Sequence, residues 1–355
     1  MAKIRVLVVE DSLTVRKHLV DVLSADPDLE VVAEAPDGKA AIDLCLQLRP
    51  DVITLDMMLP IMSGLAATEY VMAYCPTPIV IVSASTNRGE LFRTYDALAA
   101  GALEVVEKPR ADDDLEWNAH FTATVKLASR IKVITHLKGR LRTPPDAVAR
   151  SETTTAPLRP THRVVAVGAS TGGPGAVLQI LRALPPTFPL PLLLIIHVGA
   201  AFAAALAEWL DGLSPLRVSF ARDSEHLPGA GQGRVLLAPA DCHLIVERER
   251  LRLSSAPPRL SCRPSVDVLF ESLAREVGAE TIACLLTGMG RDGASGLLDI
   301  RKAGGLTIAQ DEASSVVFGM PREAIALNAA ERILPVEAIA PILVNAVARS
   351  QSRSR

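Results

Sequence analysis

The sequence predicts an α/β protein, because short apolar segments typical of buried strands alternate with longer segments of helical periodicity. Strands joined through helices run in the same direction, so the sheets should be mostly parallel. Hydrophobic residues make up 49% of the chain and aromatic residues only 3%, so the cores must be aliphatic. At 355 residues the chain should contain about two domains, each of about 150 residues.

The first 138 residues contain five strand–helix units. We expect a flavodoxin-like, five-stranded parallel sheet with helices on both faces. The expected strands are residues 4–9, 31–35, 52–55, 79–82 and 105–106, and the expected helices are residues 13–24, 39–48, 64–74, 90–99 and about 114–137.

Polar residues follow these strands at the edge where parallel sheets bind ligands. The carboxylates of Glu10, Asp11 and Asp56 would repel one another unless a cation lies among them, and such oxygen ligands suit Mg²⁺. Ser83 and Lys108 follow two further strands and could bind a phosphoryl group carried on a carboxylate. Any one of the acids could simply cap a helix, but helix capping does not explain five such groups at strand ends.

Residues 3–130 resemble the receiver domain of bacterial response regulators. The resemblance implies that Asp56 is the phosphorylation site, and that Asp11 and Asp56 bind Mg²⁺ with help from Glu10 and the Met58 carbonyl.

The same resemblance assigns the sensing of the phosphoryl group to Ser83 and Lys108. Val105 stands where many receivers have an aromatic switch residue, so we expect the signal to travel through backbone or loop shifts instead.

Residues 139–162 are rich in proline, threonine and arginine and lack periodicity, which predicts a surface linker. The arginines of this segment could form a docking surface, but a solvated linker is the better interpretation. A second domain should occupy residues 163–347, and residues 348–355 read as a polar tail.

For the second domain we expect a mostly parallel, doubly wound sheet with an antiparallel excursion. The expected strands are residues 164–167, 191–196, 217–220, 281–286 and 306–310, with 234–237, 243–246 and 251–253 as the antiparallel excursion; the expected helices are residues 175–184, 201–210 and 264–277, one ending at 303, and two after Pro321 and Pro335.

The segment Gly168-Ala169-Ser170-Thr171-Gly172-Gly173 follows the strand at 164–167. It allows three interpretations: a nucleophile elbow around Ser170, a phosphate-binding helix N-terminus, or a plain strand-to-helix turn. The phosphate interpretation is weak, because the lysine of a P-loop and the G-x-G-x-x-G spacing are both missing. These six residues alone do not separate the other two.

Three chemically reactive side chains follow strands of the second domain: Ser170, His197 and Asp292. Parallel strands bring their carboxyl ends to one edge, so these side chains can meet there as nucleophile, base and orienting acid. Backbone N–H groups near Thr171 and Met289 could form an oxyanion hole. A lone histidine at a strand end is usually structural and an aspartate in a glycine loop usually caps a helix, but their joint placement favours catalysis.

Among the seven histidines, only His243 rivals His197 as the base, because the others lie on helical stretches, in the linker or in a polar loop. The order Ser…His…Asp along the chain differs from that of the α/β-hydrolases, so the fold should be a different one.

Four segments of the second domain, GASTGG, RPSVDVLF, LTGMGRDGASGLL and AQDEASSVVFGMP, resemble the methylesterase domain of the CheB family of chemotaxis receptor-modifying enzymes. The resemblance implies Ser170 as nucleophile, His197 as base, Asp292 as orienter, and Thr171 and Met289 as oxyanion donors. It also implies hydrolysis of glutamate methyl esters on chemotaxis receptors with release of methanol, and deamidation of receptor glutamines, which some members of the family carry out. No cofactor is expected in this domain, and a histidine kinase is expected as phosphodonor.

Ile196 stands where the family commonly has glutamine, and residues 199–201 replace a proline-bearing stretch, so substrate contacts beside His197 are open. Two alternatives therefore stay: an esterase acting on a methylated protein outside chemotaxis, and a response regulator with a binding-only output. The second domain lacks a small basic DNA-binding region.

The net charge of −3 gives no general attraction to nucleic acid or to an anionic membrane. The five cysteines form no C-x-x-C pair, which argues against a zinc site or disulfide framework and fits a reducing cytoplasm. The N-terminus lacks a signal peptide, and no segment is long enough to span a bilayer. We therefore expect a cytoplasmic protein.

Overall fold

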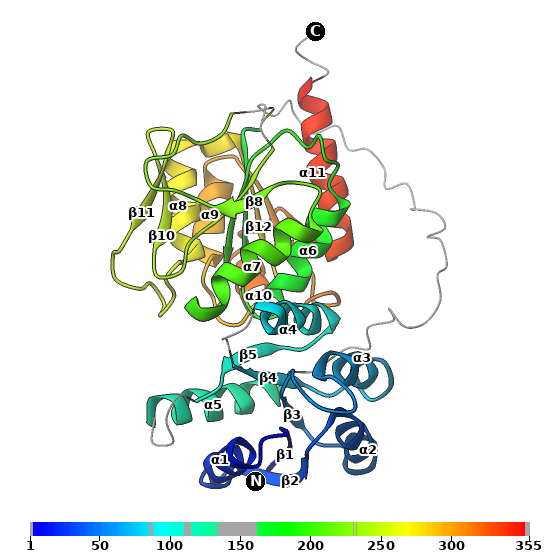
Figure 1. Cartoon of the computed structure of the whole chain (residues 1–355). Coiled ribbons are helices and arrows are strands. Elements are labelled where there is room, and N and C mark those ends of the chain that lie inside the picture. The colour runs from blue at the N-terminus through cyan, green and yellow to red at the C-terminus, as the bar shows by residue number, and fades with distance from the viewer. Residues whose placement is uncertain are drawn as a thin grey trace.

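The computed structural model describes residues 3–84, 88–109, 115–131, 133, 162–229, 231 and 233–351. It confirms the predicted α/β class: a five-stranded sheet is formed by the first part of the chain, and a seven-stranded sheet by the second part (Figure 1). The predicted linker at 139–162 lies outside the described residues, apart from His162.

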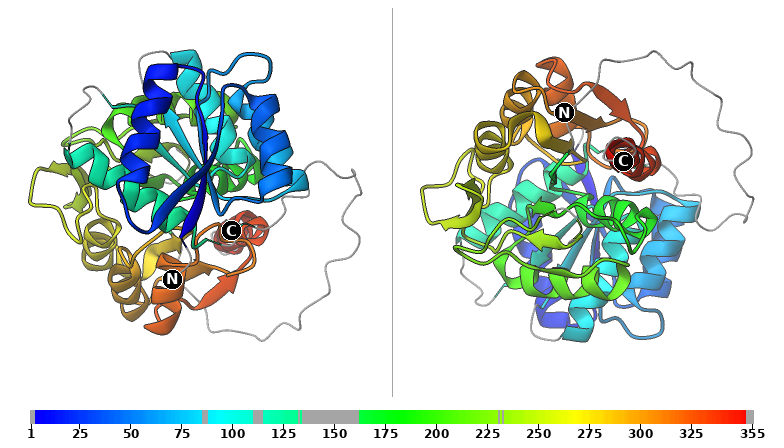
Figure 2. Two further views of the ribbon diagram at one scale, coloured as in Figure 1. Left: turned by 90° about the horizontal axis from the view of Figure 1, so that it is seen from below. Right: turned by 90° about the horizontal axis from the view of Figure 1, so that it is seen from above.

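The N-terminal unit is a parallel sheet with strand order β2-β1-β3-β4-β5. Helices lie on both sides of it, as Figure 2 shows from below. The strands are β1 (Ile4–Val9), β2 (Leu29–Ala35), β3 (Val52–Leu55), β4 (Ile79–Ser83) and β5 (Glu104–Glu107), and the helices are α1 (Leu13–Ser24), α2 (Gly38–Leu48), α3 (Gly64–Tyr74), α4 (Arg88–Ala100) and α5 (Leu115–Ala128).

Alternation of side chains along β1 explains how its two faces are covered. Val6 and Val8 pack in one core with side chains of α1 and α5. Leu7 and Val9 point to the opposite face, in the core that includes residues of α2, α3 and α4. Both faces of β1 are therefore apolar, as a central parallel strand requires.

The C-terminal unit is a seven-stranded parallel sheet with strand order β14-β13-β12-β6-β7-β9-β8, plus an antiparallel hairpin of β10 and β11. Its strands are β6 (Val164–Ala169), β7 (Leu192–Ile196), β8 (Val218–Phe220), β9 (Val235–Leu237), β10 (His243–Glu247), β11 (Arg250–Ser254), β12 (Thr281–Leu285), β13 (Leu306–Gln310) and β14 (Arg332–Leu334).

Helices cover both faces of this sheet, so that it is buried between two layers. Side chains of α6, α7 and α11 share the core with Val165 and Val167, whereas side chains of α8, α9 and α10 share the core with Val164 and Ala166. The helices are α6 (Gly173–Ala183), α7 (Ala200–Leu213), α8 (Val266–Glu276), α9 (Ala294–Lys302), α10 (Met320–Ala326) and α11 (Val336–Gln351), with a short 3-10 turn at Gly278–Glu280.

Helix α4 lies between the two units and packs against α6 and α7 (Figure 1). The Tyr95 hydroxyl donates to the Phe202 carbonyl at 2.7 Å, and the Trp209 indole N–H donates to Asp96 at 2.9 Å. The Tyr95 and Trp209 rings pack with their centroids 5.4 Å apart. The same apolar core continues from one unit into the other, so the units form an extensive contact.

Most predicted elements are confirmed within three residues, but two expectations were wrong: the end of the helix expected to reach residue 137, and the place of the strand at 234–237. The helix expected to reach residue 137 ends at Ala128, where Ile131 N–H bonds to the Ala128 carbonyl in a tight turn. Helix α8 begins two residues later than expected, with Pro264 directly before the N-cap Ser265. Helix α11 continues through the start of the predicted polar tail to Gln351.

The strand at 234–237 belongs to the main sheet rather than to the antiparallel excursion. Strand β9 pairs in parallel with β7 and with β8. Only β10 and β11 form the excursion, with Leu244 opposite Leu253. Strand β14 was not predicted at all; it is an edge strand whose Arg332 and Ile333 are exposed, so it lacks the apolar run of a buried strand.

Candidate active site

Ser170 follows β6 in a tight turn that leads into α6. Its N–H donates to the Thr287 carbonyl at 3.0 Å, and its carbonyl accepts from Gly173 N–H at 2.7 Å. Gly172 has a φ of 76°, a conformation that favours glycine, and a Cβ on Gly288 would lie 2.7 Å from the Ser170 Cβ. The glycines are therefore required by the turn, which holds Ser170 at the end of a buried strand.

The predicted nucleophile, base and acid come from three neighbouring strands. In the sheet, β6 lies between β12 and β7. Ser170 directly follows β6, His197 directly follows β7, and Asp292 lies in the loop after β12. From β6 the next strands in the chain, β7 to β9, lie on one side of it, and the later strands, β12 to β14, lie on the other side. The carboxyl end of β6 is therefore a topological switch point, which is where open α/β sheets bind their ligands.

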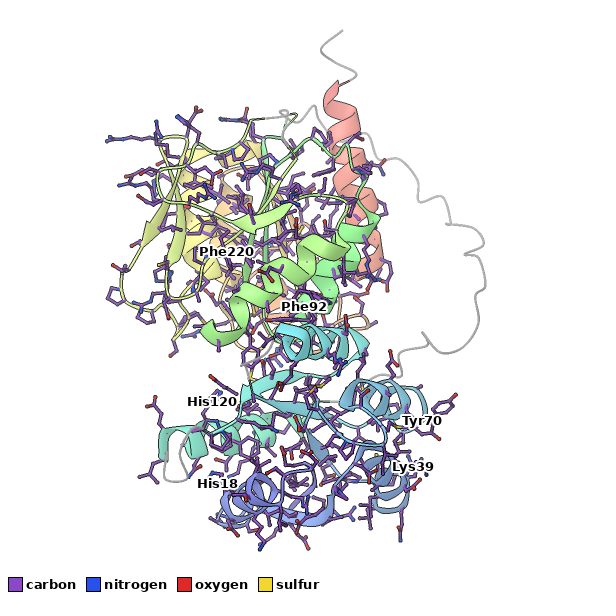
Figure 3. The ribbon with its side chains drawn as sticks, in the orientation of Figure 1. His18, Lys39, Tyr70, Phe92, His120 and Phe220 are labelled. Atoms are coloured by element: carbon purple, nitrogen blue, oxygen red, sulfur yellow. The ribbon has the colours of Figure 1, made fainter. Side chains whose placement is uncertain are left out.

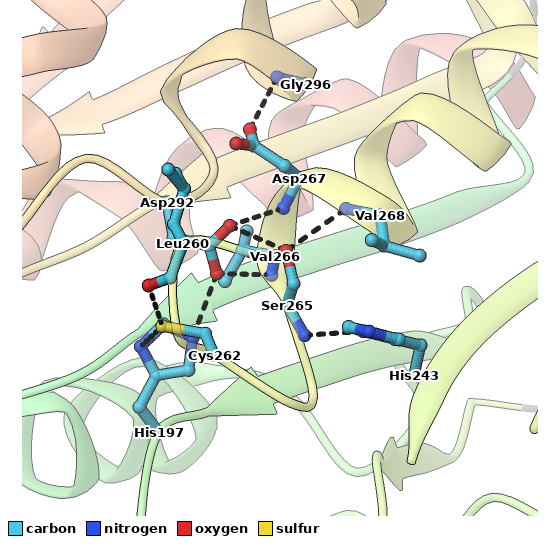
Figure 4. A network of polar contacts seen from close by, with 10 residues as sticks. All are labelled: His197, His243, Leu260, Cys262, Ser265, Val266, Asp267, Val268, Asp292 and Gly296. Carbon is cyan, nitrogen blue, oxygen red and sulfur yellow. Dashed lines mark hydrogen bonds and ion pairs between the residues drawn. The ribbon is translucent and has the colours of Figure 1, made fainter. Parts of the chain in front are cut away.

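Asp292 is held by the N-terminus of α8 and pairs with His197 (Figure 4). The His197 Nε2 lies 3.0 Å from Asp292 Oδ2. Asp292 also accepts from the Ser265 hydroxyl at 2.7 Å and from the N–H groups of Val266 at 2.7 Å and Asp267 at 3.1 Å. A carboxylate at a helix N-terminus is stabilised by the helix dipole as well as by these donors.

These contacts shift the pKa of both members of the pair. Burial of Asp292 would raise its pKa, but the hydrogen bond and charge of His197 and the α8 donors outweigh burial and lower it. Burial of His197 would lower its pKa, but hydrogen bonds with Asp292 and Cys262 outweigh burial and raise the pKa to about 9. The arrangement therefore favours an ionised Asp292 beside a protonated imidazole.

Ser170 and His197 line the same cavity of about 890 Å³, together with Thr171 and Met289. No hydrogen bond joins Ser170 Oγ to the imidazole in the part of the chain that the structure describes. Within the described residues, the N–H groups of Thr171 and Met289 donate no hydrogen bond to another protein group either. All five predicted groups are thus brought to one region, with Asp292 buried behind His197.

His243, the alternative base, has a structural environment. It is 1% exposed. One ring nitrogen lies 3.2 Å from the Pro257 carbonyl, and the other accepts from Ser265 N–H at 3.1 Å. Both nitrogens are thereby occupied by backbone groups, which explains why a histidine begins strand β10.

Cys262 places its sulfur 3.9 Å from His197 Nδ1, so His197, Cys262 and Asp292 have distances that a metal site would need. A carboxylate has about four lone-pair sites. Those of Asp292 already receive three protein donors besides His197. Asp292 therefore has no oxygen lone pair left for an ion, and the cluster is better suited to orienting His197.

A second cluster lies at the carboxyl edge of the N-terminal sheet. Lys108 Nζ lies 2.9 Å from Glu10 and 3.0 Å from Asp56. Asp56 is 2% exposed, and its Oδ1 is buried without a hydrogen-bond partner. Oxygen atoms of Glu10, Asp11 and Asp56 all lie within 4.8 Å of one another.

The electrostatics of this cluster fit a divalent cation. Burial and the nearby charge of Asp56 raise the pKa of Glu10 to about 7, against the effect of Lys108. For Lys108, burial acts to lower the pKa, but Glu10 and Asp56 outweigh it and raise the pKa. An unpartnered buried carboxylate oxygen among acids is what an oxygen-ligated Mg²⁺ would satisfy, so the predicted ligands Glu10, Asp11 and Asp56 suit the ion.

The Ser83 hydroxyl is not hydrogen-bonded to Asp56. Its hydroxyl donates to Glu90 on α4 at 2.6 Å, and Ala84 N–H donates to the same carboxylate oxygen at 3.1 Å. The end of β4 is thereby connected to the helix that contacts the C-terminal unit.

Sequence reasoning missed two residues of the candidate site. Ser265 could have been recognised as an N-cap from its position before an apolar helix, but nothing in its pattern indicates a bond to Asp292. Glu104 on β5 accepts a hydrogen bond from the Thr171 hydroxyl at 2.9 Å, across the contact between the units. No local pattern signals such a contact.

Comparison with known proteins agrees with this architecture. Residues 6–119 match the response regulator receiver domain family, and residues 165–343 match the family described as CheB methylesterase. These matches define the class of protein: a receiver domain joined to a methylesterase-type output domain.

Full-length relatives are also similar. The chain is 46% identical over 338 residues to "Protein-glutamate methylesterase/protein-glutamine glutaminase 2" of Anaeromyxobacter dehalogenans, with 95% of each chain covered. It is 44% identical over 353 residues to a protein-glutamate methylesterase/protein-glutamine glutaminase of Nitrosospira multiformis, with 97% of each covered. A crystal structure of the Thermotoga maritima CheB methylesterase catalytic domain has 35% identity and a TM-score of 0.49, covering 52% of this chain and 98% of that chain. The family match and the full-length relatives show that the chain belongs to the CheB methylesterase family.

Among the residues that the structure describes, no helix is long and apolar enough to cross a membrane.

Proposed function

We propose that the protein hydrolyses γ-methyl esters of glutamate side chains on chemotaxis receptors, releases methanol, and deamidates receptor glutamines at the same site. The observation that carries this proposal is the meeting of Ser170, His197 and Asp292 at the switch point of a sheet in a CheB-family chain. Relatives with the printed name protein-glutamate methylesterase/protein-glutamine glutaminase support the choice of substrate.

In the proposed reaction, Ser170 Oγ attacks the ester carbonyl while His197 accepts its proton. Because His197 Nε2 pairs with Asp292, Nδ1 is the nitrogen that faces Ser170 in the proposed reaction, and it must exchange its 3.9 Å contact with Cys262 Sγ for the Ser170 hydroxyl. Proton transfer requires an approach to hydrogen-bond distance, which commonly tightens only when substrate is bound. His197 then gives the proton to departing methanol, and water resolves the acyl-enzyme.

Charge develops on the carbonyl oxygen during attack, where the N–H groups of Thr171 and Met289 are proposed to donate. Neither group has another acceptor among the described residues, which supports this role. One such donor contributes about 3 kcal/mol to the stability of the transition state. An amide carbonyl develops the same charge, so the site can also deamidate glutamine.

We further propose that phosphorylation of Asp56 by a histidine kinase controls this activity. The cavity at the candidate active site is walled on one side by β5 and α5, including His120 (labelled in Figure 3). A receptor helix is about 10–12 Å across with its side chains. Such a helix has to approach Ser170 from the side that the N-terminal unit now covers, so the arrangement described is an inactive one.

The proposed signal runs from Asp56 through Ser83 to α4. Mg²⁺ held by Glu10, Asp11, Asp56 and the Met58 carbonyl would neutralise charge on the phosphoryl group. A phosphoryl group brings about two negative charges and three acceptor oxygens. These oxygens can accept the hydroxyl hydrogen bond that Ser83 now donates to Glu90 at 2.6 Å.

Loss of that bond acts on the helix that holds the units together. Helix α4 carries Tyr95 and Asp96, which bond to residues of α7, and α7 begins three residues after His197. This route needs no aromatic residue at Val105. It replaces a rotamer switch with a shift of α4, and we propose that the shift loosens the contact between the units.

The test is methanol release from methyl-labelled receptor membranes. Wild type, Ser170→Ala, Asp56→Asn and the control Ser254→Ala are compared with and without Mg²⁺ and a small phosphodonor. Ser254 lies on the hairpin, where its hydroxyl accepts from Ala256 N–H, and it does not line the cavity. We expect release that requires Ser170, is unaffected in Ser254→Ala, and rises with phosphodonor unless Asp56 is replaced by Asn.

Release that persists in Ser170→Ala contradicts the proposed nucleophile. If methanol release requires Ser170 but does not change with phosphodonor, the proposed esterase activity is supported and the proposed regulation by phosphorylation is refuted. No release from any form directs the search to a methylated protein outside chemotaxis or to a binding output.

A further inference from the structure

The N-terminal unit places a glutamate side chain in the candidate active site. Glu104 is the first residue of β5, and its Oε2 accepts from the Thr171 hydroxyl at 2.9 Å, one residue after Ser170. Its Oε1 accepts from the neighbouring Val105 N–H at 3.2 Å. Glu104 lines the cavity together with Ser170 and His197.

This carboxylate is poorly placed for stability alone. Burial raises the pKa of Glu104, and the hydrogen bonds of Thr171 and Val105, with the charge of His197, offset that effect only in part. A carboxylate that loses water at a contact usually costs free energy unless it is fully paired, and an apolar side chain would dock at lower cost. Its position among the reactive groups therefore calls for a functional explanation.

The chemistry of the reaction supplies one. If the proposed function is correct, on which this inference rests, the product of every turnover is a glutamate side chain whose carboxylate lies beside Ser170 and His197. Glu104 is the same kind of side chain: it comes from the N-terminal unit, lines the cavity that Ser170 and His197 also line, and bonds to Thr171, the residue after Ser170.

We propose that the site contains a carboxyl-binding subsite at the Thr171 hydroxyl, and that Glu104 fills this subsite as an internal analogue of the product. The receiver then inhibits by occupying the reacting position as well as by covering it. Release of the receiver empties the subsite for the substrate ester, whose carbonyl group takes the place of the Glu104 carboxylate.

The experiment uses full-length Glu104→Ala, Glu104→Gln and the control Glu30→Ala in the methanol-release assay. Glu30 is an exposed residue of β2, far from the contact along the sheet. Without phosphodonor we expect Glu104→Ala to be about ten-fold faster than wild type, which corresponds to about 1.4 kcal/mol of lost inhibitory contact. Glu104→Gln keeps the acceptor but loses the charge and should be intermediate, and Glu30→Ala should match wild type.

Acetate tests whether the effect is occupancy of a carboxyl subsite. Replacement by alanine removes the equivalent of one acetate from the cavity, so acetate should inhibit unphosphorylated Glu104→Ala more than chloride at equal ionic strength. It should also raise the melting temperature of Glu104→Ala but not that of wild type, a readout independent of turnover.

Two results overturn the inference: an unchanged basal rate in Glu104→Ala, or a raised rate with no specific effect of acetate on rate or melting temperature. The second result would mean that Glu104 only blocks space. Failure of the proposed function is distinguishable, because then phosphodonor-treated wild type also releases no methanol.

Discussion

Replacing Ser265 with alanine should separate the positioning of Asp292 from the stability of α8. The hydroxyl donates to Asp292 at 2.7 Å and, at 3.4 Å, accepts from Val268 N–H as the N-cap of α8. A hydrogen bond to a charged group contributes about 1.5–3 kcal/mol. Because the cap bond is long, we expect most of the loss to fall on Asp292.

Ser272→Ala is the matched control on the same helix. Ser272 is 2% exposed, and its hydroxyl bonds to Val246 N–H at 3.0 Å and to the Leu269 carbonyl at 2.7 Å. Leaving buried partners unsatisfied costs about 1–3 kcal/mol, so both variants should unfold more easily by similar amounts. Only Ser265→Ala removes a donor from Asp292.

The assay is kcat for methanol release by phosphodonor-treated protein, with the free energy of unfolding measured by urea denaturation. If loss of this hydrogen bond raises the activation free energy by about 1.4 kcal/mol, kcat of Ser265→Ala falls about ten-fold. Ser265→Thr, which keeps a hydroxyl at the cap, should recover much of that loss. Equal kcat losses in Ser265→Ala and Ser272→Ala, or no loss in either, would refute the reasoning.

Two further predictions concern His197 and the turn after β6. A base acts in its deprotonated form, and the pKa of His197 is raised to about 9, so the rate should increase as the pH rises through about 9. The Cys262→Ala substitution removes one contact that raises this pKa. It should therefore move the midpoint of the pH–rate profile to lower pH. A midpoint that is the same in both proteins would contradict the role of Cys262. Gly172→Ala should lower the melting temperature, because its φ is 76° and its new Cβ would lie 2.5 Å from Val316, whereas Gly212→Ala in α7 has open space and should be neutral or stabilising. Equal melting temperatures for the two variants would show that the turn accommodates a side chain.

The residues at the carboxyl ends of the strands could be read directly from the sequence. Ser170, His197, Asp56 and Lys108 each follow a short apolar run, and parallel connections bring such ends to one edge whatever the details of packing. Local periodicity and turn chemistry also determined most element boundaries. These are short-range properties, so they can be read from neighbouring residues.

Contacts between segments that are distant in the chain depend on how the elements pack, and no local pattern predicts them. The role of Ser265 depends on how α8 packs beside the loop after β12, 27 residues away. The pairing of β9 in parallel with β7, rather than in the excursion, depends on which strand it meets and not on its own three residues. Glu104 meets Thr171 only because α4 packs on α6 and α7, and that docking depends on the shape of two surfaces, which no local pattern of residues encodes.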